Sequence, residues 1–296
     1  MASSDTGLAP DTAPDVALRH IVAACHAELL KYRAIVLTSR RSVGIHQTRV
    51  ALRQMRAAFG LFRSAVDGPV VRALSAEAKW LAGECGPARD LHVFLTETVS
   101  DVPPVVKRIA NRLAKAHFER ARSALAGARF TAFDRKLEAF AALSPAATHQ
   151  RLDAFARTVL DKRHRKVVQR GRKIDTLDSV GLHRLRIALK KLRYAASFLQ
   201  PAFPSRTFAS PGAKPYIEAT VRLQGALGAL NDRAVAAHVL ADLATAARPT
   251  EDAAKPLKAL AKQAASGDKR RRRKLARAWK TFWKAECFWR GDKPRS

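Results

Sequence analysis

Two stretches of the sequence decide the fold: IHQTRVALRQMRAAFGLF at residues 45–62 and LHRLRIALKKLRYAASFL at residues 182–199. They align without a gap at an offset of 137 residues and share the pattern H-x-x-R-[VI]-A-L-[RK]-x-[ML]-R. A shorter echo follows each stretch, GPARD at 86–90 and GALND at 228–232. This internal repeat predicts a chain built from two related halves.

Each repeat reads as an amphipathic helix with a cationic face. At about 100° per residue, the histidine and three basic residues of each copy fall within an arc of about 80°, and apolar side chains such as Leu52 and Leu189 fall on the far side. One face should pack and the other present charge. The candidate anion-binding residues of the two repeats are therefore His46, Arg49, Arg53, Arg56, His183, Arg186, Lys190 and Arg193.

These two cationic faces contain no acidic residue, which is unusual for a helix surface that merely contacts water. Solvated faces normally mix charges so that i,i+4 pairs attract, whereas like charges at these spacings disfavour the free fold by roughly 1–2 kcal/mol in total. We interpret the faces as binding surfaces for an anion; a solvated face is the alternative. The histidines are interpreted as hydrogen-bond donors to phosphate oxygens, with metal ligation, phosphoacceptor chemistry and helix orientation as competing roles.

The overall charge points the same way. The chain of 296 residues holds 55 Lys and Arg against 25 Asp and Glu, a net charge of +30. Residues 269–296 contribute twelve basic and two acidic residues, a net of +10, so +20 remains in the body of the protein. Distributed charge of this size favours a polyanionic partner over a single phosphorylated metabolite.

The chain is predicted to be all-α and to form two related helical-bundle halves. Apolar residues recur at spacings of three and four, and alternating β-branched runs are missing. Residues 1–14 read as a disordered leader. Helices are expected at roughly 15–39, 43–66, 69–85, 90–99, 103–127, 130–143, 148–173, 179–200, 213–228, 231–247 and 252–285, with breaks at Pro103-Pro104, Ser144-Pro145, residues 201–215 and Pro256.

Further basic residues extend the candidate surface. Four cations on one arc of the helix 103–127 form a possible third lining element, and the dense segment 162–173 supplies two more; these are Arg108, Arg112, Lys115, Arg122, Arg165 and Arg172. Asp90 and Asp232 are interpreted as helix N-caps, with alignment of neighbouring arginines as the alternative role. The KRRRRK run at 269–274 is a weak nucleic-acid or targeting signal, and the aromatic stripe that follows it, Trp279, Phe282, Trp283 and Phe288, is interpreted as core.

Several classes of protein are disfavoured. Cys25, Cys85 and Cys287 are widely separated and show no C-x-x-C spacing, which argues against a disulfide framework or a zinc site and fits a cytoplasmic protein. We expect no signal peptide and no membrane span, because no stretch approaches about 18 uninterrupted apolar residues. No metal, cofactor or catalytic residue is predicted, and we expect no enzymatic activity.

At IHQTRVALRQMR, PARDLHVFL, LHRLRIALKKLRYAASFL and LQGALGALNDRAVAAHVL the sequence resembles the CHAD family of conserved-histidine α-helical domains. The resemblance covers about residues 16–290. It implies a domain at 15–290, with halves at about 15–145 and 146–290 and a tail at 291–296. It also implies pseudo-two-fold symmetry, a central basic groove or pore, and binding of inorganic polyphosphate. Arg89 of the first echo joins the candidate ligands, but Asn231 replaces it in the second.

CYTH triphosphatase domains often accompany CHAD domains, but no E-x-E-x-K motif precedes Val16, so a stand-alone domain is expected. The main rival function is nucleic-acid binding, for which the charge serves equally well. A metal-dependent phosphohydrolase is the less favoured rival, because the basic helices lack carboxylate clusters. The sequence leaves open whether binding would serve attachment to polyphosphate granules, storage, scaffolding or regulation.

Overall fold

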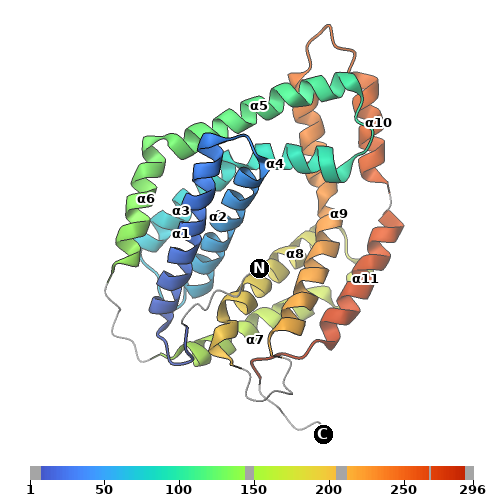
Figure 1. Ribbon diagram of the computed structural model, residues 1–296. Helices are drawn as coiled ribbons and strands as arrows, with labels where there is room; N and C mark the ends of the chain where they lie inside the picture. Colours follow the sequence, from blue (N-terminus) through green and yellow to red (C-terminus); the bar gives the residue numbers. More distant parts are fainter. Residues whose placement is uncertain (1–7, 144–149, 205–211, 267, 291–296) are drawn as a thin grey trace.

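The computed structural model describes residues 8–143, 150–204, 212–266 and 268–290, without the side chains of residues 231–234. The described residues form helices and no strands, as the apolar spacing predicts (Figure 1). The α-helices are α1 (Pro14–Thr38), α2 (Ser42–Phe62), α3 (Pro69–Glu84), α4 (Gly86–Val93), α5 (Pro104–Ala126), α6 (Ala128–Ala141), α7 (Leu152–Gly171), α8 (Ser179–Leu199), α9 (Lys214–Ala246), α10 (Ala254–Ala265) and α11 (Asp268–Lys284). Short helical turns of other kinds occupy Phe94–Thr98, Ile174–Thr176 and Gln200–Ala202.

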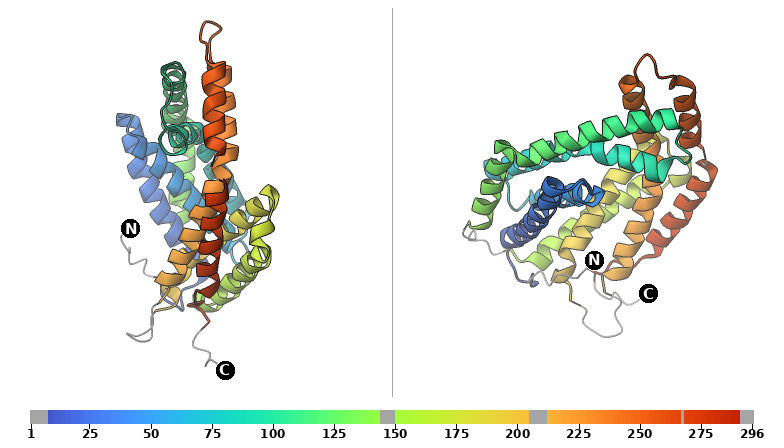
Figure 2. Two further views of the ribbon diagram at one scale, coloured as in Figure 1. Left: turned by 90° about the vertical axis from the view of Figure 1, so that its right-hand side faces the viewer. Right: turned by 45° about the horizontal axis from the view of Figure 1, so that its top comes forward.

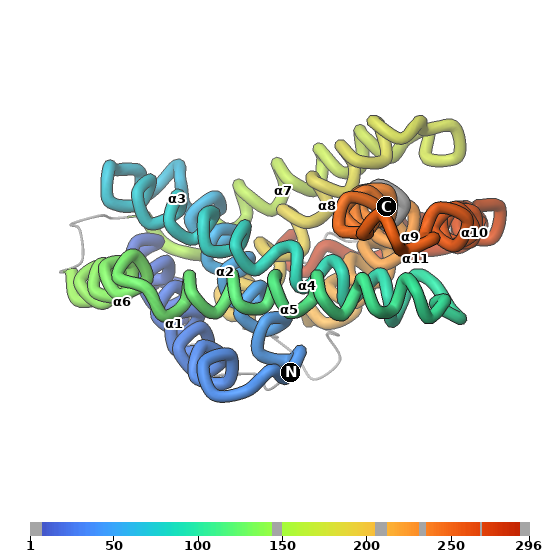
Figure 3. Tube along the Cα trace, turned by 90° about the horizontal axis from the view of Figure 1, so that it is seen from above, coloured from blue at the N-terminus to red at the C-terminus, as the bar shows by residue number. Residues whose placement is uncertain are grey.

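The helices α2 and α8 lie at the middle of the molecule, where the two halves meet. In Figure 1, α1, α2, α3 and α6 occupy one side, α9, α10 and α11 the other, and α5 crosses the top between them. Figure 2 shows that the molecule is narrower when it is turned by 90°. Seen from above in Figure 3, α5 runs along one long side of the molecule, while α7 lies toward the other. The two repeated helices therefore occupy the contact region between the halves.

The hydrophobic core does not divide into two independent units. One large cluster of buried side chains includes residues of both repeats, such as Phe62 and Leu192, and extends from α1 to α11. A smaller cluster joins α4 and α5 to the C-terminal half of α9 and to α10, with Ile109 and Leu243 among its members. Both clusters combine residues of the first and second halves. The halves are therefore held together by shared cores.

The predicted break between residues 228 and 231 is wrong, because α9 is continuous from Lys214 to Ala246. The equivalent place in the first half does break: α3 ends at Glu84, and α4 begins at Gly86 with Pro87 in its first turn. A proline in mid-helix removes a backbone donor and clashes with the preceding turn, whereas in the first turn it does neither. The second echo has Ala229 where the first has Pro87, so its helix can continue.

The predicted single helix at 252–285 is also wrong. It is divided into α10 and α11, and Ser266, with ψ of 161°, is extended at the end of α10. Pro256 does not break the chain, because it is the third residue of α10, where no intrahelical donor is required. The remaining predicted helices agree with the structure except at their ends. For example, α2 stops at Phe62 rather than at 66, and the segment 144–149 lies outside the described residues.

The predicted disordered leader needs a correction for residues 8–13. Leu8 is 4% exposed and belongs to the large core cluster. The carbonyl oxygens of Pro10 and Thr12 accept hydrogen bonds from the backbone N–H groups of Asp153 and Leu152, at 3.0 and 2.9 Å. These N–H groups belong to the first turn of α7 and would otherwise lack a partner. Residues 1–7 and the predicted tail at 291–296 lie outside the described residues.

Candidate functional site

The apolar faces of the two repeated helices fix the direction of their charged faces. On α2, the apolar side chains Leu52, Met55, Phe59 and Phe62 are at most 3% exposed, and on α8 Leu185, Leu189, Leu192 and Leu199 are fully buried. Their burial is the main favourable contribution to the packing of these helices. With this side of each helix turned inward, the basic side chains stay partly or fully accessible.

Tyr194 connects α2 to α8, and Arg193 connects α8 to α9. The Nε of Arg53 donates a hydrogen bond of 2.7 Å to the hydroxyl oxygen of Tyr194, which lies on α8 and is 4% exposed. Arg193 lies over the same tyrosine ring, 4.3 Å from its centroid, and donates to Gln224 on α9 at 2.7 Å. Tyr194 therefore holds one arginine from each repeat close to the same ring.

The cations of both repeats meet at a surface that we name the central cation cluster, consisting of Arg53, Arg56, Arg186, Lys190 and Arg193. Burial, and next the charges of the four arginines, lower the pKa of Lys190 to about 8. Arg53 and Arg56 come from α2, and the other two arginines share α8 with Lys190. Within the described residues, no member of the cluster forms an ion pair with a carboxylate. Among the described residues, cations of both predicted ridges thus lie close enough for their charges to act on one lysine.

His46 and Arg49 flank this cluster on the α2 side. Burial, and then the charges of Arg89 and Arg53, lower the pKa of His46, which favours the neutral imidazole with its single ring N–H donor. Arg49 donates to the carbonyl oxygen of Ala82 at 2.7 Å, and its Nη2 lies 3.8 Å from the Oδ1 of Asp90. Arg49 therefore both anchors α2 to α3 and carries charge toward the cluster.

The equivalent arginines of the two repeats each lie beside the glycine of the following echo. A Cβ at Gly86 would be 3.1 Å from the Nη1 of Arg49, and a Cβ at Gly228 would be 3.8 Å from the Nη1 of Arg186. The first approach is tight enough that a larger residue would displace the guanidinium. The H-x-x-R motif and the glycine echo, which the sequence separates, are thus adjacent in both halves.

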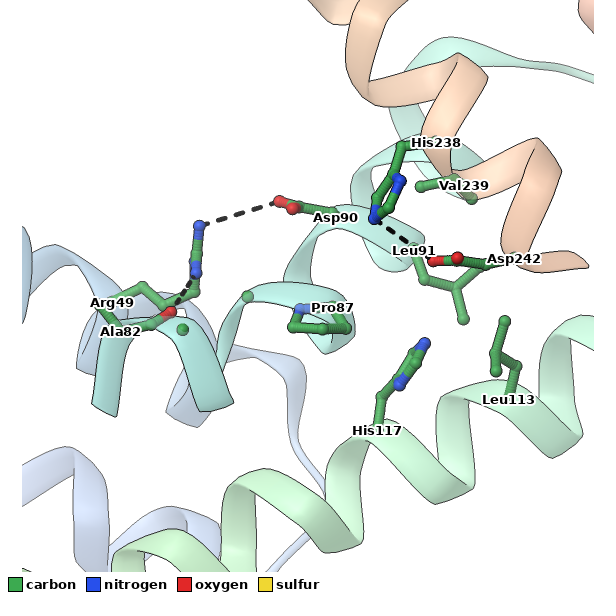
Figure 4. Close-up of a pocket in the computed structure, with 12 residues that line it drawn as sticks. Arg49, Ala82, Pro87, Asp90, Leu91, Leu113, His117, His238, Val239 and Asp242 are labelled. Carbon is green, nitrogen blue, oxygen red and sulfur yellow. Dashed lines mark hydrogen bonds and ion pairs between the residues drawn. The ribbon is translucent and has the colours of Figure 1, made fainter. Parts of the chain in front are cut away.

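Asp90 does not cap a helix, contrary to the prediction. It lies in the middle of α4, because this helix begins at Gly86, and its carboxylate faces Arg49 instead (Figure 4). The side chain of Asp232 lies outside the described residues. The Nη2 of Arg89, in the same echo, lies 3.2 Å from the Oε1 of Glu97. The positive charge of Arg89 also lowers the pKa of His46. The first echo therefore orients and partly neutralises charge at the edge of the cluster.

Two of the four cations predicted as a third lining element on α5 contact acidic residues. Arg112 forms a two-pronged ion pair with Glu251 at 2.9 and 2.8 Å and donates to the Ala246 carbonyl oxygen, which ties α5 to the end of α9. Arg122 lies 3.8 Å from Glu119. Arg108 and Lys115 are exposed, and His183 on α8 is exposed as well. Arg112 is therefore balanced by an acid and Arg122 lies near one, so the role of α5 in binding stays a prediction.

The two residues predicted in the segment 162–173 are exposed, and two other arginines of this segment contact α8. Arg165 and Arg172 are exposed, whereas Arg163 and Arg170 donate to the α8 carbonyl oxygens of Lys191 and Arg184. The angular positions of these arginines around the α7 axis distinguish the packed residues from the exposed ones. Counted from the buried Leu160, Arg163 falls at about 300° and Arg165 at about 140°. Only the first of these two lies on the packed side.

A pocket of about 260 Å³ borders Arg49, and Figure 4 shows its lining from α3, α4, α5 and α9. The carboxylate of Asp90 points toward Arg49, and on another side of the pocket the Nε2 of His238 is 3.8 Å from the Oδ2 of Asp242. Burial lowers the pKa of His117, which also lines the pocket. Two carboxylates make this pocket mixed in charge, unlike the central cation cluster. Among the described side chains, no group of three or more His, Cys, Asp or Glu residues is placed to hold a metal ion.

The aromatic stripe on α11 is only partly core. Phe282 is fully buried and Trp279 is half-buried, as predicted, but Trp283 is 58% exposed, which the stripe interpretation did not predict. The ring centroids of Trp279 and Trp283 lie 6.0 Å apart.

No helix in the described ranges is long and apolar enough to cross a membrane.

The fold and the arrangement of basic helices define an all-α protein with a central cationic surface, and its family is shown by comparison. The family model for the CHAD domain matches residues 20–241, and the chain therefore belongs to the CHAD family. The crystal structure of the CHAD domain from the plant Ricinus communis is similar, with 25% identity, a TM-score of 0.77 and coverage of 94% of each chain.

PptA from Streptomyces chartreusis has 19% identity and a TM-score of 0.59 over 91% of this chain and 97% of its own, a likeness of fold alone. No match to this sequence is found among curated proteins.

Proposed function

We propose that this protein binds inorganic polyphosphate, without catalysis, along the basic surface formed by α2 and α8. Membership of the CHAD family, which is associated with polyphosphate-related proteins, supports the proposal. The single observation that carries it is the surrounding of Lys190 by four arginines drawn from both repeats. Cations that have no carboxylate partner among the described side chains repel one another and disfavour the free fold, and an anion bound there offsets that repulsion.

A polymer fits this surface better than a single phosphate does. Arg186 and Arg193 are about 10 Å apart along the axis of α8, and Arg53 and Arg56 extend the surface onto α2. One orthophosphate contacts only part of such a surface. A flexible chain of phosphates contacts all of it and releases several condensed counterions together. Binding should therefore be steeply weakened by salt and stronger for longer chains.

The proposal includes a pseudo-two-fold relation between the halves, with the two repeated helices lining one groove or pore. The matching positions of Arg49 beside Gly86 and Arg186 beside Gly228 support it. A chain that crosses the groove engages one ridge and then meets the other at a high effective concentration. Affinity for long chains then exceeds what either ridge provides alone.

Single-stranded nucleic acid is a second candidate, favoured by one observation. Trp283 is 58% exposed on the strongly basic α11, where an indole ring can stack with a base. Polyphosphate has no aromatic face. Replacing Trp283 by Ala therefore distinguishes the two ligands: nucleic-acid binding would weaken, whereas polyphosphate binding would not change.

Calorimetric titration tests the proposed function directly. Long-chain polyphosphate, orthophosphate and duplex DNA are compared at equal total charge and at two salt concentrations. We expect tight binding of the long chain, much weaker binding of orthophosphate, and a steep loss of long-chain affinity with salt. Equal affinity per phosphate for orthophosphate and the long chain would rule out polymer binding.

The absence of catalysis is tested separately, by incubating the protein with polyphosphate, Mg²⁺ or Mn²⁺, and ADP. We expect no change in chain length and no ATP. Turnover that disappears in His46→Ala or His183→Ala protein would contradict the non-catalytic part of the proposal alone. In cells, the proposal places the protein in the cytoplasm at polyphosphate granules, which a fluorescent fusion with and without polyphosphate synthesis would test.

A further inference from the structure

A second basic surface lies between α7 and α8, and no part of it belongs to the central cation cluster. A pocket of about 200 Å³ opens there, and its lining residues are Arg163, Lys166, Arg170, Arg184, Ile187, Ala188 and Lys191. We name it the α7–α8 pocket. On α8, Lys191 is about 100° around the helix axis from Lys190, and Arg184 is about 160° from Arg186. The same helix therefore presents two separate cationic surfaces.

Two arginines of the pocket hold its walls together. Arg163 donates to the carbonyl oxygen of Lys191 at 2.6 Å and to that of Gly60 at 3.3 Å. Arg170 donates to the carbonyl oxygen of Arg184 at 2.7 Å. These bonds fix the separation of α7 and α8 along the pocket. Arg163 and Arg170 thus hold α7 and α8 in place, while the other cations of the pocket are available to bind a ligand.

Three further cations project around this frame. Lys166, Arg184 and Lys191 are exposed, and among the described residues none of them has an ion pair with a carboxylate. None of the lining residues is acidic. Burial lowers the pKa of the Arg163 guanidinium to about 10, with no neighbouring acid to oppose the shift. Five positive charges thus surround one small concave space.

We propose that the α7–α8 pocket binds a compact phosphoryl anion of the size of pyrophosphate. A volume of about 200 Å³ equals that of roughly six or seven liquid waters and is below the usual range of about 300–1,000 Å³ for drug-sized ligands. A ligand with several negative charges and many acceptor oxygens suits five cations better than a monovalent ion does. Ile187, which is 40% exposed, and Ala188 form an apolar wall that limits hydration of the site.

The shared chemistry has two sources, free pyrophosphate and the end of a polyphosphate chain. The proposal does not depend on binding at the central cation cluster. The test compares titrations of pyrophosphate, at fixed ionic strength and without divalent ions, into the parent protein and into the triple variant Lys166→Gln/Arg184→Gln/Lys191→Gln. Arg163 and Arg170 are left in place because they hold the helices together.

A matched control removes the same charge elsewhere. Lys255→Gln/Lys258→Gln/Lys262→Gln changes three exposed lysines of α10, remote from the pocket lining. We expect the pocket variant to lose about tenfold or more in pyrophosphate affinity and the control about twofold or less. Circular dichroism confirms folding, and the double variant Arg184→Gln/Lys191→Gln replaces the triple one if that fails to fold.

Two further experiments locate the pyrophosphate site and identify the source of its ligand. In Arg56→Gln/Lys190→Gln protein, which alters only the central cation cluster, pyrophosphate should still bind and still be lost on adding the pocket substitutions. If long chains also bind the pocket variant more weakly, the pocket takes chain ends; if only pyrophosphate is affected, it takes the free anion. Equal pyrophosphate affinity of the folded pocket variant and the α10 control would overturn the proposal.

Discussion

The central cation cluster and the basic arc of α5 (Arg108, Arg112, Lys115 and Arg122) both have cations at helical spacing but differ in their surroundings. Both place several cations at helical spacing on one face, and both were predicted to line the same surface. At the cluster, Lys190 is surrounded by arginines. On α5, Arg112 is paired with Glu251 and Arg122 lies near Glu119. The difference indicates that the net charge of a basic helix face depends on the carboxylates that tertiary structure brings near, as well as on the number of cations.

The largest expected effect comes from removing three charges at each place. Arg56→Gln/Arg186→Gln/Lys190→Gln should weaken long-chain polyphosphate binding by about 100-fold, at about 1 kcal/mol for each partly exposed contact. Arg108→Gln/Lys115→Gln/Arg122→Gln on α5 should weaken it by about threefold or less, through net charge alone. Calorimetric titration of both folded variants checks this. Similar losses in the two variants would remove the distinction between these surfaces.

A smaller effect is expected from pH. With a pKa of about 8, Lys190 is mostly charged at pH 7 and mostly neutral at pH 9 in the free protein. Long-chain affinity should therefore fall between these values, by about threefold for the loss of one partly exposed contact. Titrations at both pH values should show a smaller fall in Lys190→Arg, because arginine stays charged.

The α5 substitution Lys115→Arg is the matched control and should keep the pH dependence of the parent. If Lys190→Arg binds with the same fall in affinity as the parent, another group is responsible for that fall.

The ion pair on α5 should affect stability rather than binding. Hydrogen bonds from Arg112 hold the pKa of Glu251 at about 2, below its ordinary 4.5. A carboxylate with a lowered pKa stabilises the fold above pH 4.5, and this contribution is lost as pH falls from 4.5 toward 2. Arg112→Gln should therefore lower the melting temperature at pH 7, with the difference shrinking over that acidic range.

Melting curves measured from pH 7 to pH 2 check this prediction, and long-chain affinity at pH 7 should stay close to that of the parent. A large loss of affinity in the folded Arg112→Gln protein would return α5 to the binding surface.

The smallest effect concerns repulsion within the cluster. Arg56 is exposed and acts unfavourably on Lys190, so Arg56→Gln should raise the unfolding free energy by a few tenths of a kcal/mol. The gain should be larger at low salt than at high salt, because salt screens the repulsion. Denaturant melts at both salt concentrations measure it. A destabilised variant would mean that Arg56 makes a favourable contact that outweighs the repulsion.

Local periodicity predicted much of the fold and the direction of the two charged faces. The buried positions of Leu52 and Leu189 follow from spacing within one helix, and so do the opposing arginines. Local periodicity did not predict the contacts between the two halves. Tyr194 reads as one more aromatic residue, and nothing local indicates that its hydroxyl accepts a hydrogen bond from Arg53, 141 positions earlier.

The same limit applies to the ion pair on α5. Glu251 lies 139 positions from Arg112, so the neutralisation of α5 depends on tertiary structure. The continuity of α9, by contrast, was readable, because Ala229 replaces Pro87 and removes the reason for a break. The phase of Arg163 on α7 was readable as well, once Leu160 is taken as the buried reference.

The most direct test of the central claim is to locate the bound chain on the protein. Side-chain Nε–Hε NMR signals of arginine, assigned by single substitution, would be followed during titration with long-chain polyphosphate. The account predicts that the signals of Arg53, Arg186 and Arg193 shift first and most, while those of Arg108 and Arg122 change little. Early shifts confined to the α5 arginines, with the α2 and α8 signals unmoved, would contradict it.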